Sequence, residues 1–150
     1  MPSALPALDH RLVNRPQPEV SIVVPSWNES GTLTDLSERI RSVLEASDTA
    51  YELIVVDDGS RDDTVARVQA LAAHWPALRV VRLPSNQGKG AAVQRGVQEA
   101  TGDFILVQDA DLEYDPADYL PMLEELGRAE RRSVYGSRPL GIIRDCGWRW

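Results

Sequence analysis

The chain has 150 residues, a length that fits one domain with a single hydrophobic core and argues against a tandem arrangement of domains. Its 43% hydrophobic and 26% charged residues are typical of an ordinary globular domain, and they argue against wholesale disorder, a collagen-like fibre or a coiled coil. The formal net charge of −7, from 16 Lys and Arg against 23 Asp and Glu, argues against a protein that binds nucleic acid through its phosphates.

Cysteine content and hydropathy indicate the compartment. The single cysteine, Cys146, excludes an intramolecular disulfide framework and a multi-cysteine zinc site, and it fits a reducing environment. No apolar run approaches the about 18 residues needed to cross a bilayer, and residues 1–20 contain prolines where a signal peptide would have its hydrophobic stretch. We therefore expect a cytoplasmic protein that neither spans a membrane nor is exported.

The chain divides into three parts. Residues 1–18 contain four prolines among scattered polar residues, which predicts a flexible leader. We expect the folded domain at residues 19–138 and an irregular tail at residues 139–150.

Four strands are predicted, at residues 21–25, 52–57, 78–83 and 103–108. Each is a short, nearly continuous apolar run rich in β-branched residues, as in strands buried on both faces. The segments between and after them have apolar residues at helical spacing: Leu33, Leu36, Ile40 and Val43; Val65, Val68, Leu71, Ala72 and Trp75; Val93, Gly96, Val97 and Ala100; Leu120, Leu123 and Leu126. Four strand-then-helix units in series predict an α/β fold with a doubly wound, mainly parallel sheet, right-handed crossovers and flanking helices.

Two helix starts carry sequence signals. Ser60 and Asp63 have the spacing of a capping box, which predicts Ser60 as an N-cap. Asp115 is followed directly by Pro116, which predicts Asp115 as an N-cap and Pro116 as a residue of the first helical turn. In open α/β sheets ligands bind beyond the carboxyl ends of the strands, near the point where strand order reverses. The residues expected there lie at 27–29, 57–59, 86–90 and 109–111, and this edge is strongly acidic.

The strongest chemical signal is the pair Asp109 and Asp111, which follows the fourth strand. In an extended segment residues i and i+2 point the same way, so both carboxylates can converge on one hard cation, with Ala110 leaving room for a ligand. Oxygen ligation with few protein donors suits Mg²⁺ or Mn²⁺ whose other positions are filled by water and phosphate. The alternative is a solvated acidic turn.

Two further groups follow the first and second strands. Asp57 and Asp58 can accept hydrogen bonds from ribose hydroxyls or a base, or they can cap the following helix. Glu29 adds a third acidic residue. Trp27 beside it can stack on a nucleobase or pack in the core.

Two basic residues, Lys89 and Arg138, are candidates for binding phosphate. The loop at 86–90 is not a Walker loop and is only half of a dinucleotide fingerprint, because Val93 stands where the third small residue belongs. Its Lys89 either approaches a diphosphate or lies in water. Arg138, after a predicted fifth strand at 133–135, suits clamping of phosphate oxygens. The two histidines, His10 and His74, do not accompany any serine or cysteine nucleophile, so a catalytic triad has no support.

Five motifs in this order resemble those of the family-2 GT-A glycosyltransferases, and most of all the dolichyl- or polyprenyl-phosphate mannosyl- and glucosyltransferases. They are Val-Pro-Ser-Trp-Asn-Glu at 24–29, Val-Asp-Asp-Gly-Ser at 56–60, Asn-Gln-Gly-Lys-Gly at 86–90, Gln-Asp-Ala-Asp-Leu at 108–112 and Tyr-Gly-Ser-Arg at 135–138. The resemblance covers residues 20–138 and implies a Rossmann-like domain that binds a nucleotide-sugar.

The resemblance also implies roles for individual residues. The donor site would comprise Pro25, Trp27, Glu29, Val56, Asp58, Lys89, Asp109, Ala110 and Leu112. Asp109 and Asp111 of the DxD motif would hold the metal with Glu113 as a further ligand, and Asp109, Asp111 and Arg138 would be the catalytic residues. We also expect carboxylates from two strands, Asp58 and Asp111, to meet around the cation.

The implied activity is an inverting, metal-dependent transfer of a hexose from a UDP- or GDP-linked donor, with Mg²⁺ or Mn²⁺, in cell-envelope or lipid-linked glycan biosynthesis. The implied acceptor is a polyprenyl or dolichyl phosphate, with the protein peripheral at the cytoplasmic face of the membrane. The tail beyond Gly141 departs from the family pattern, so we expect a C-terminal truncation. The alternatives are therefore an inactive donor-binding fragment, a receiver-like signalling domain without enzymatic activity, and a dinucleotide-binding oxidoreductase domain.

Overall fold

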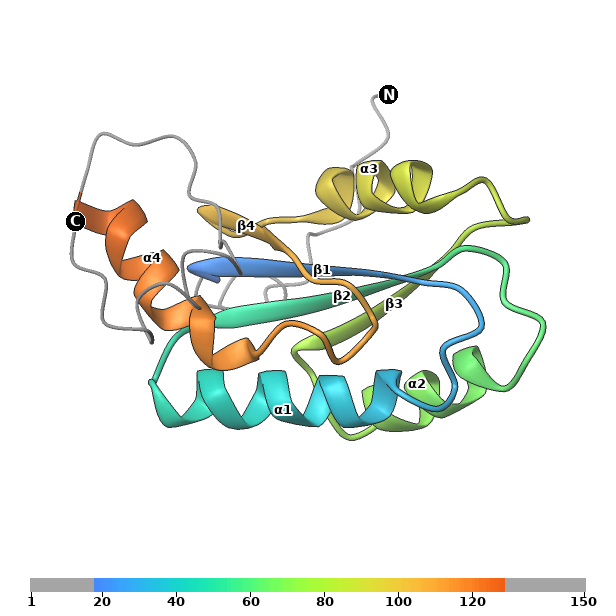
Figure 1. Ribbon diagram of the computed structural model, residues 1–150, viewed down its shortest axis with the longest axis horizontal. Coiled ribbons are helices and arrows are strands. Elements are labelled where there is room, and N and C mark those ends of the chain that lie inside the picture. The colour runs from blue at the N-terminus through green and yellow to red at the C-terminus, as the bar shows by residue number, and fades with distance from the viewer. Residues whose placement is uncertain (1–17, 129–150) are drawn as a thin grey trace, which may run out of the picture.

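The computed structural model describes residues 18–128 (Figure 1). The elements in chain order are β1 (Val20–Ser26), α1 (Leu33–Ala46), β2 (Tyr51–Asp57), α2 (Thr64–Ala72), β3 (Leu78–Arg82), α3 (Lys89–Glu99), β4 (Phe104–Val107), the 3₁₀ helix η2 (Pro116–Asp118) and α4 (Tyr119–Arg128). All four predicted strands are present within two residues of their expected bounds. Most of the predicted leader, the fifth strand at 133–135 and the tail at 139–150 lie outside the described residues.

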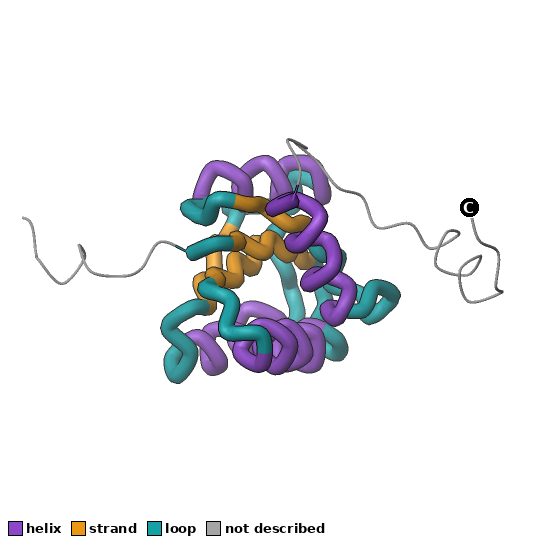
Figure 2. Tube along the Cα trace, turned by 90° about the vertical axis from the view of Figure 1, so that its left-hand side faces the viewer, coloured by secondary structure: helices purple, strands orange, loops and turns teal. Residues whose placement is uncertain are grey.

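The four strands form one parallel sheet in the order β3-β2-β1-β4. The chain runs outward from β1 to β2 and β3, and then returns across β1 to place β4 on its other side. Helices α1 and α2 cover one face and α3 covers the other (Figures 1 and 2). The predicted doubly wound α/β fold is confirmed, and β1 is the position at which the strand order reverses.

Successive side chains of β1 and β2 point to opposite faces of the sheet, so the hydrophobic core has one part on each face. Ile22 and Val24 pack against the side chains of α1, whereas Val23 packs with Ile54 and Ala92 beneath α3. The close approach of α3 requires small residues, because a Cβ at Gly96 would collide with the Val23 side chain. Burial of both faces explains why β1 and β2 are continuous apolar runs in the sequence.

The outer strands and two helices differ from the sequence expectation. The prediction of burial on both faces is wrong for the two edge strands. In β4 burial alternates, so Ile105 and Val107 are exposed, and in β3 only Leu78 is buried and Arg82 is exposed. In α3 the buried positions are Ala92 and Gly96, and Val97 is exposed. Leu120 of α4 is exposed as well. The sequence pattern could not show which strands lie at the sheet edges, and hence which helix faces remain uncovered.

The helix-start signals were right in one case out of two. Asp115 accepts a hydrogen bond from the Ala117 amide and caps η2, as predicted. Helix α2 begins at Thr64 with Asp63 at its N-cap, so Ser60 does not cap it. The Ser60 hydroxyl instead accepts a hydrogen bond from the Asn28 amide across the loops.

A buried carboxylate joins the amino ends of the strands. Oε1 of Glu52 accepts hydrogen bonds from Ser21 Oγ at 2.6 Å, from Thr101 N at 2.6 Å and from Thr101 Oγ1 at 2.9 Å. Its Oε2 pairs with Arg79 Nη2 at 2.9 Å. Burial raises the pKa of Glu52, but these hydrogen bonds outweigh it and hold the pKa below its ordinary value.

Between residues 18 and 128, none of the helices combines the length and apolarity that a bilayer crossing requires.

Candidate functional site

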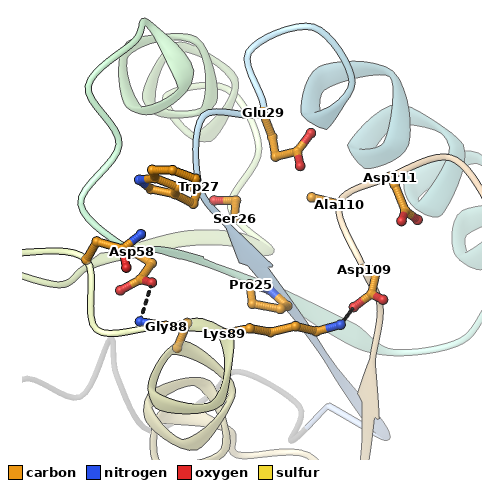
Figure 3. A pocket seen from close by; sticks show the side chains of 12 residues that line it. Pro25, Ser26, Trp27, Glu29, Asp58, Gly88, Lys89, Asp109, Ala110 and Asp111 are labelled. Atoms are coloured by element: carbon orange, nitrogen blue, oxygen red, sulfur yellow. Dashed lines mark hydrogen bonds and ion pairs between the residues drawn. The ribbon is translucent and has the colours of Figure 1, made fainter.

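A pocket opens at the carboxyl ends of the strands, where β1 lies between β2 and β4 (Figure 3). Parallel strands end at the same edge of a sheet, and the reversal of strand order at β1 separates the loops on its two sides. The pocket is lined by Pro25, Ser26, Trp27, Glu29, Asp58, Asn86, Gly88, Lys89, Ala92, Asp109, Ala110 and Asp111.

The loop after β1 is fixed by hydrogen bonds to the loop after β2. The amide of Asn28, which has a φ of 55°, donates to Ser60 Oγ at 2.9 Å, and Asn28 Oδ1 accepts from the Arg61 amide at 2.9 Å. The amide of Glu29 donates to Thr64 Oγ1 at 2.9 Å. These bonds hold Trp27 in the pocket wall with 51% of its surface exposed, so the core-packing alternative for Trp27 is wrong. An exposed aromatic face in a pocket can stack on a flat ring.

Asp57, the last residue of β2, and Asp58, which follows it, have different environments. Asp57 is 1% exposed, accepts hydrogen bonds from the Ser60 amide at 3.2 Å and pairs with Arg82 at 3.4 Å. Asp58 lines the pocket, and its two oxygens accept hydrogen bonds from the amides of Gln87 at 2.7 Å and Gly88 at 2.8 Å. Neither residue caps α2, which begins later in the chain.

The loop at 86–90 therefore depends on the end of β2 for its conformation. Gly88 has a φ of 92°, a region that favours glycine, and it precedes the first residue of α3. Gly59 has a φ of 74°, and a Cβ there would lie 2.7 Å from the Asn86 nitrogen. The two loops touch backbone to backbone.

Lys89, the first residue of α3, reaches across the pocket. Its side chain extends past Pro25 to the turn after β4, where Nζ pairs with Asp109 Oδ1 at 2.6 Å (Figure 3). The side chain of Lys89 is 62% exposed and that of Asp109 is 31% exposed. Lys89 therefore does not simply lie in water, and its charge is within reach of any anion bound in this pocket.

The turn that carries Asp109 and Asp111 is held from beneath by a buried pair. Gln108, 3% exposed, donates from Nε2 to the carbonyl of Asp109 at 3.0 Å and accepts from the Tyr119 hydroxyl at 2.7 Å. Burial, assisted by the charge of Asp115, raises the pKa of Tyr119 above its ordinary value, which keeps this hydroxyl protonated as a donor.

The acidic side chains fit a divalent cation with few protein ligands. Asp109 and Asp111 both line the pocket and both offer carboxylate oxygens, the donors that Mg²⁺ and Mn²⁺ accept alongside water and phosphate. Over residues 18–128, no three His, Cys, Asp or Glu side chains are grouped closely enough to hold a metal by themselves. Glu113 is exposed and its amide donates to Asp111 Oδ1 at 3.3 Å.

Several expected site residues are placed differently. Asp58 does not meet Asp111 around a common point: the two lie on opposite sides of the pocket in Figure 3, because Asp58 is held by the loop before α3. Val56 is fully buried beneath α3, and neither Leu112 nor Glu113 lines the pocket. Arg138 lies outside the described residues.

Sequence reasoning assigned site roles to eight of the twelve residues that line the pocket. Asn86 and Gly88 were expected at this edge only as part of the loop at 86–90, and Ser26 and Ala92 were given no role. Ala92 is buried one helical turn into α3, and only the spacing from Gly88 could have indicated that it would face the pocket. Gln108 belongs to the motif at 108–112 but was given no role, and its contact with Tyr119, 11 residues further along the chain, carries no recognisable sequence signal.

Comparisons with known proteins agree with this geometry. The model of the family described as glycosyl transferase family 2 matches residues 21–150. A dodecaprenyl-phosphate galacturonate synthase from Rhizobium johnstonii is 39% identical over 121 residues, which cover 80% of this chain and 36% of that protein. A dolichol-phosphate mannosyltransferase from Pyrococcus furiosus is 38% identical over 120 residues, which cover 80% of this chain and 33% of that protein. The chain thus spans about a third of the length of these relatives.

Solved structures show the same fold. A mannosyltransferase from Pyrobaculum calidifontis, solved with GDP-Man and Mn²⁺, superimposes with a TM-score of 0.67 at 25% identity, over 89% of this chain and 42% of that one. Glucosyl-3-phosphoglycerate synthase from Mycobacterium tuberculosis was solved with Mn²⁺, UDP and phosphoglyceric acid. It gives a TM-score of 0.60 at 30% identity, over 75% of this chain and 40% of that one. The parallel sheet with flanking helices is therefore that of the GT-A glycosyltransferases.

Proposed function

The chain belongs to glycosyl transferase family 2, and on that premise we propose that it is the donor-binding part of an inverting, metal-dependent hexosyltransferase that uses a nucleoside-diphosphate sugar and a polyprenyl phosphate acceptor. Its relatives include transferases of sugars to dolichol and dodecaprenyl phosphates. The proposal goes beyond family membership in four respects: the donor, the role of the metal, the inverting mechanism and the acceptor.

The main support is the division of one pocket into two chemically different sides. An exposed aromatic ring, Trp27, and the carboxylate of Asp58 lie on one side, and the charged groups Lys89, Asp109 and Asp111 lie on the other (Figure 3). A nucleoside needs a ring partner and hydrogen-bond acceptors, and a diphosphate needs cationic partners. The pocket offers both to one ligand.

A divalent cation held by Asp109 and Asp111 would neutralise the diphosphate and make it a better leaving group. Lys89 would bring a further positive charge to the same phosphates from the start of α3. Asp58 would face the base or ribose while its oxygens also hold the loop of Gln87 and Gly88, since a carboxylate has lone pairs for more than two hydrogen bonds. Arg138 would add a guanidinium toward a phosphate.

The transfer step needs no basic residue from this pocket. The oxygen of a phosphate monoester is already anionic, and it would attack the sugar carbon in line with the departing diphosphate, which inverts the anomeric configuration. The bond from the sugar to the diphosphate breaks as the new bond forms, and the negative charge moves to the diphosphate. The groups that stabilise that charge are thus the main contribution of the chain to the rate. A lipid-linked acceptor requires the open side of the pocket to face a membrane surface.

The test is a calorimetric screen of the full chain against UDP, GDP, UDP-sugars and GDP-sugars, each with and without Mn²⁺. We expect one nucleotide series to bind, more tightly with Mn²⁺ than without it, and its identity would establish the base. A matched screen with NAD and with acetyl phosphate tests the dinucleotide-binding and receiver-like alternatives. Absence of binding to every nucleoside diphosphate would refute the proposal. Binding without transfer to polyprenyl phosphate would restrict the chain to donor binding alone.

A further inference from the structure

We propose that Lys89 is an internal counter-ion that occupies the metal-binding carboxylate of Asp109 until a divalent cation displaces it, and that the displaced ammonium then binds the diphosphate of the donor. The inference rests on the proposed function, because it concerns the same pocket. It adds a mechanism by which binding of the cation and binding of the nucleotide are coupled.

The geometry of the pocket supports the first step. Nζ of Lys89 and Oδ1 of Asp109 are 2.6 Å apart, and both belong to residues that line the pocket (Figure 3). A cation that coordinates this oxygen and an ammonium that donates to it compete for the same lone pairs. The pair is partly exposed, so it is weak enough to be exchanged.

The anchoring of Lys89 supports the second step. The residues just before it are held by Asp58, which accepts hydrogen bonds from the Gln87 and Gly88 amides at 2.7 and 2.8 Å. The backbone of Lys89 is therefore fixed to the end of β2, while its side chain is 62% exposed. Only the side chain has to move, and a lysine stem has several rotatable bonds with which to do so. The freed ammonium remains at the pocket, beside the start of α3.

A consequence distinguishes this role from simple phosphate binding. Loss of the Lys89 charge should strengthen the binding of the cation alone, because its competitor is gone, and weaken the binding of nucleoside diphosphate in the presence of the cation. A lysine that only binds phosphate, with its ammonium away from the metal-binding carboxylates, would affect the second measurement and not the first. A lysine that only stabilises the fold would affect neither constant selectively. The two opposite changes are therefore the signature of the exchange.

The experiment uses Lys89→Gln, with Lys89→Arg retaining the charge and Arg82→Gln as the matched control. Arg82 is 60% exposed, pairs with Asp57 at 3.4 Å and does not line the pocket. Binding of Mn²⁺ alone is measured from the electron paramagnetic resonance of the free ion, and binding of UDP and GDP with saturating Mn²⁺ is measured by calorimetry. Thermal unfolding verifies that each variant is folded.

We expect Lys89→Gln to bind Mn²⁺ alone about two- to fivefold more tightly, the range of exposed ion pairs, and the nucleotide about tenfold more weakly. Lys89→Arg should keep most of the nucleotide affinity. Unchanged or weaker Mn²⁺ binding by Lys89→Gln, or an equal gain in Arg82→Gln, overturns the inference while leaving the proposed function intact. Failure of the unmodified chain to bind any nucleoside diphosphate overturns both.

Discussion

Glu52 at the amino end of the sheet and Asp109 at its carboxyl end are both carboxylates with an ion-pair partner, but they have very different surroundings. At the amino end, Glu52 has 12% of its side chain exposed and accepts hydrogen bonds from two residues besides its ion pair with Arg79. At the carboxyl end, Asp109 has 31% of its side chain exposed and one ion pair, to the exposed Lys89. Glu52 has little room for a further partner, whereas Asp109 has an exchangeable one.

The difference separates a carboxylate that stabilises the fold from one that is available to a ligand. A buried charge is tolerated when hydrogen bonds and a counter-ion replace its water, and its removal then destabilises the fold. A carboxylate that keeps contact with solvent adds little to stability and retains lone pairs for a metal or a substrate. We therefore expect substitution of Glu52 to alter unfolding and substitution of the partly exposed carboxylates Asp109 and Asp111 to alter binding.

The largest effect is expected for Glu52→Ala. The substitution removes the acceptor of the Ser21 hydroxyl and of the Thr101 amide and leaves Arg79 with only its contacts to Glu99. The free energy of unfolding, measured by urea denaturation, should fall by about 3 kcal/mol. Nucleotide affinity, measured by calorimetry on the folded fraction, should stay within about twofold. A loss of binding equal to that of Asp111→Asn would contradict the distinction between a carboxylate that stabilises the fold and one that binds the ligand.

Asp111→Asn should produce the next largest effect, on binding alone. The amide keeps the shape of the side chain but removes a charged oxygen from the proposed metal site. Metal-dependent nucleotide affinity should fall by about 100-fold, and the urea midpoint should stay nearly constant. Glu113→Gln is the matched control, because Glu113 follows in the same turn and does not line the pocket. Equal losses in both variants would instead indicate a three-carboxylate metal site.

Tyr119→Phe tests a link between stability and binding. The change removes the donor to Gln108 Oε1 and leaves that buried oxygen without its 2.7 Å partner. Unfolding free energy should fall by about 1–2 kcal/mol. Gln108 also holds the carbonyl of Asp109, so we expect Mn²⁺ affinity to fall by about threefold as the acidic turn loosens. Tyr114→Phe, on an exposed tyrosine of the same region, provides the control. An unaltered Mn²⁺ affinity would show that the turn is held without Gln108.

The smallest effect is expected in the pH dependence of stability. The pKa of Glu52 is lowered in the folded chain, so its contribution is complete above the pKa of the unfolded state, about 4.3, and is lost as the pH falls through the folded pKa. The difference in unfolding free energy between the unmodified chain and Glu52→Gln should therefore shrink between about pH 6 and about pH 3. Urea denaturation at several pH values measures it. A difference that grows toward acid pH would reverse the sign of the assigned shift.

The fold could be predicted from sequence to a large extent because its signals are local. The runs that became β1 and β2 are buried on both faces, and such runs are legible without knowledge of the partners. Sheet edges are not local: Val107 is as apolar as Val24, yet one is 47% exposed and the other 1%. The order of the strands decides that difference, and no residue in β4 reveals its place in the order.

The candidate site could be predicted only as a set of residues and not as an arrangement. Asp58, Lys89 and Asp109 were each expected near one edge of the sheet, and all three line the pocket. The sequence did not show that Asp58 would turn toward the Gln87 amide and away from Asp111, or that Lys89 would reach Asp109. Those choices depend on side-chain directions and on loops that meet only in the folded chain.

The contact of Gly59 with Asn86 determines whether these two loops become ordered on folding or on ligand binding. A methyl group at residue 59 would need space already taken by the neighbouring backbone, so the two loops interlock as the chain folds. The conformational entropy of these loops is thus lost during folding and not again when a ligand arrives. A ligand that binds on the Trp27 side of the pocket therefore meets loops that are already ordered, and its affinity is not lowered by the entropy cost of ordering them.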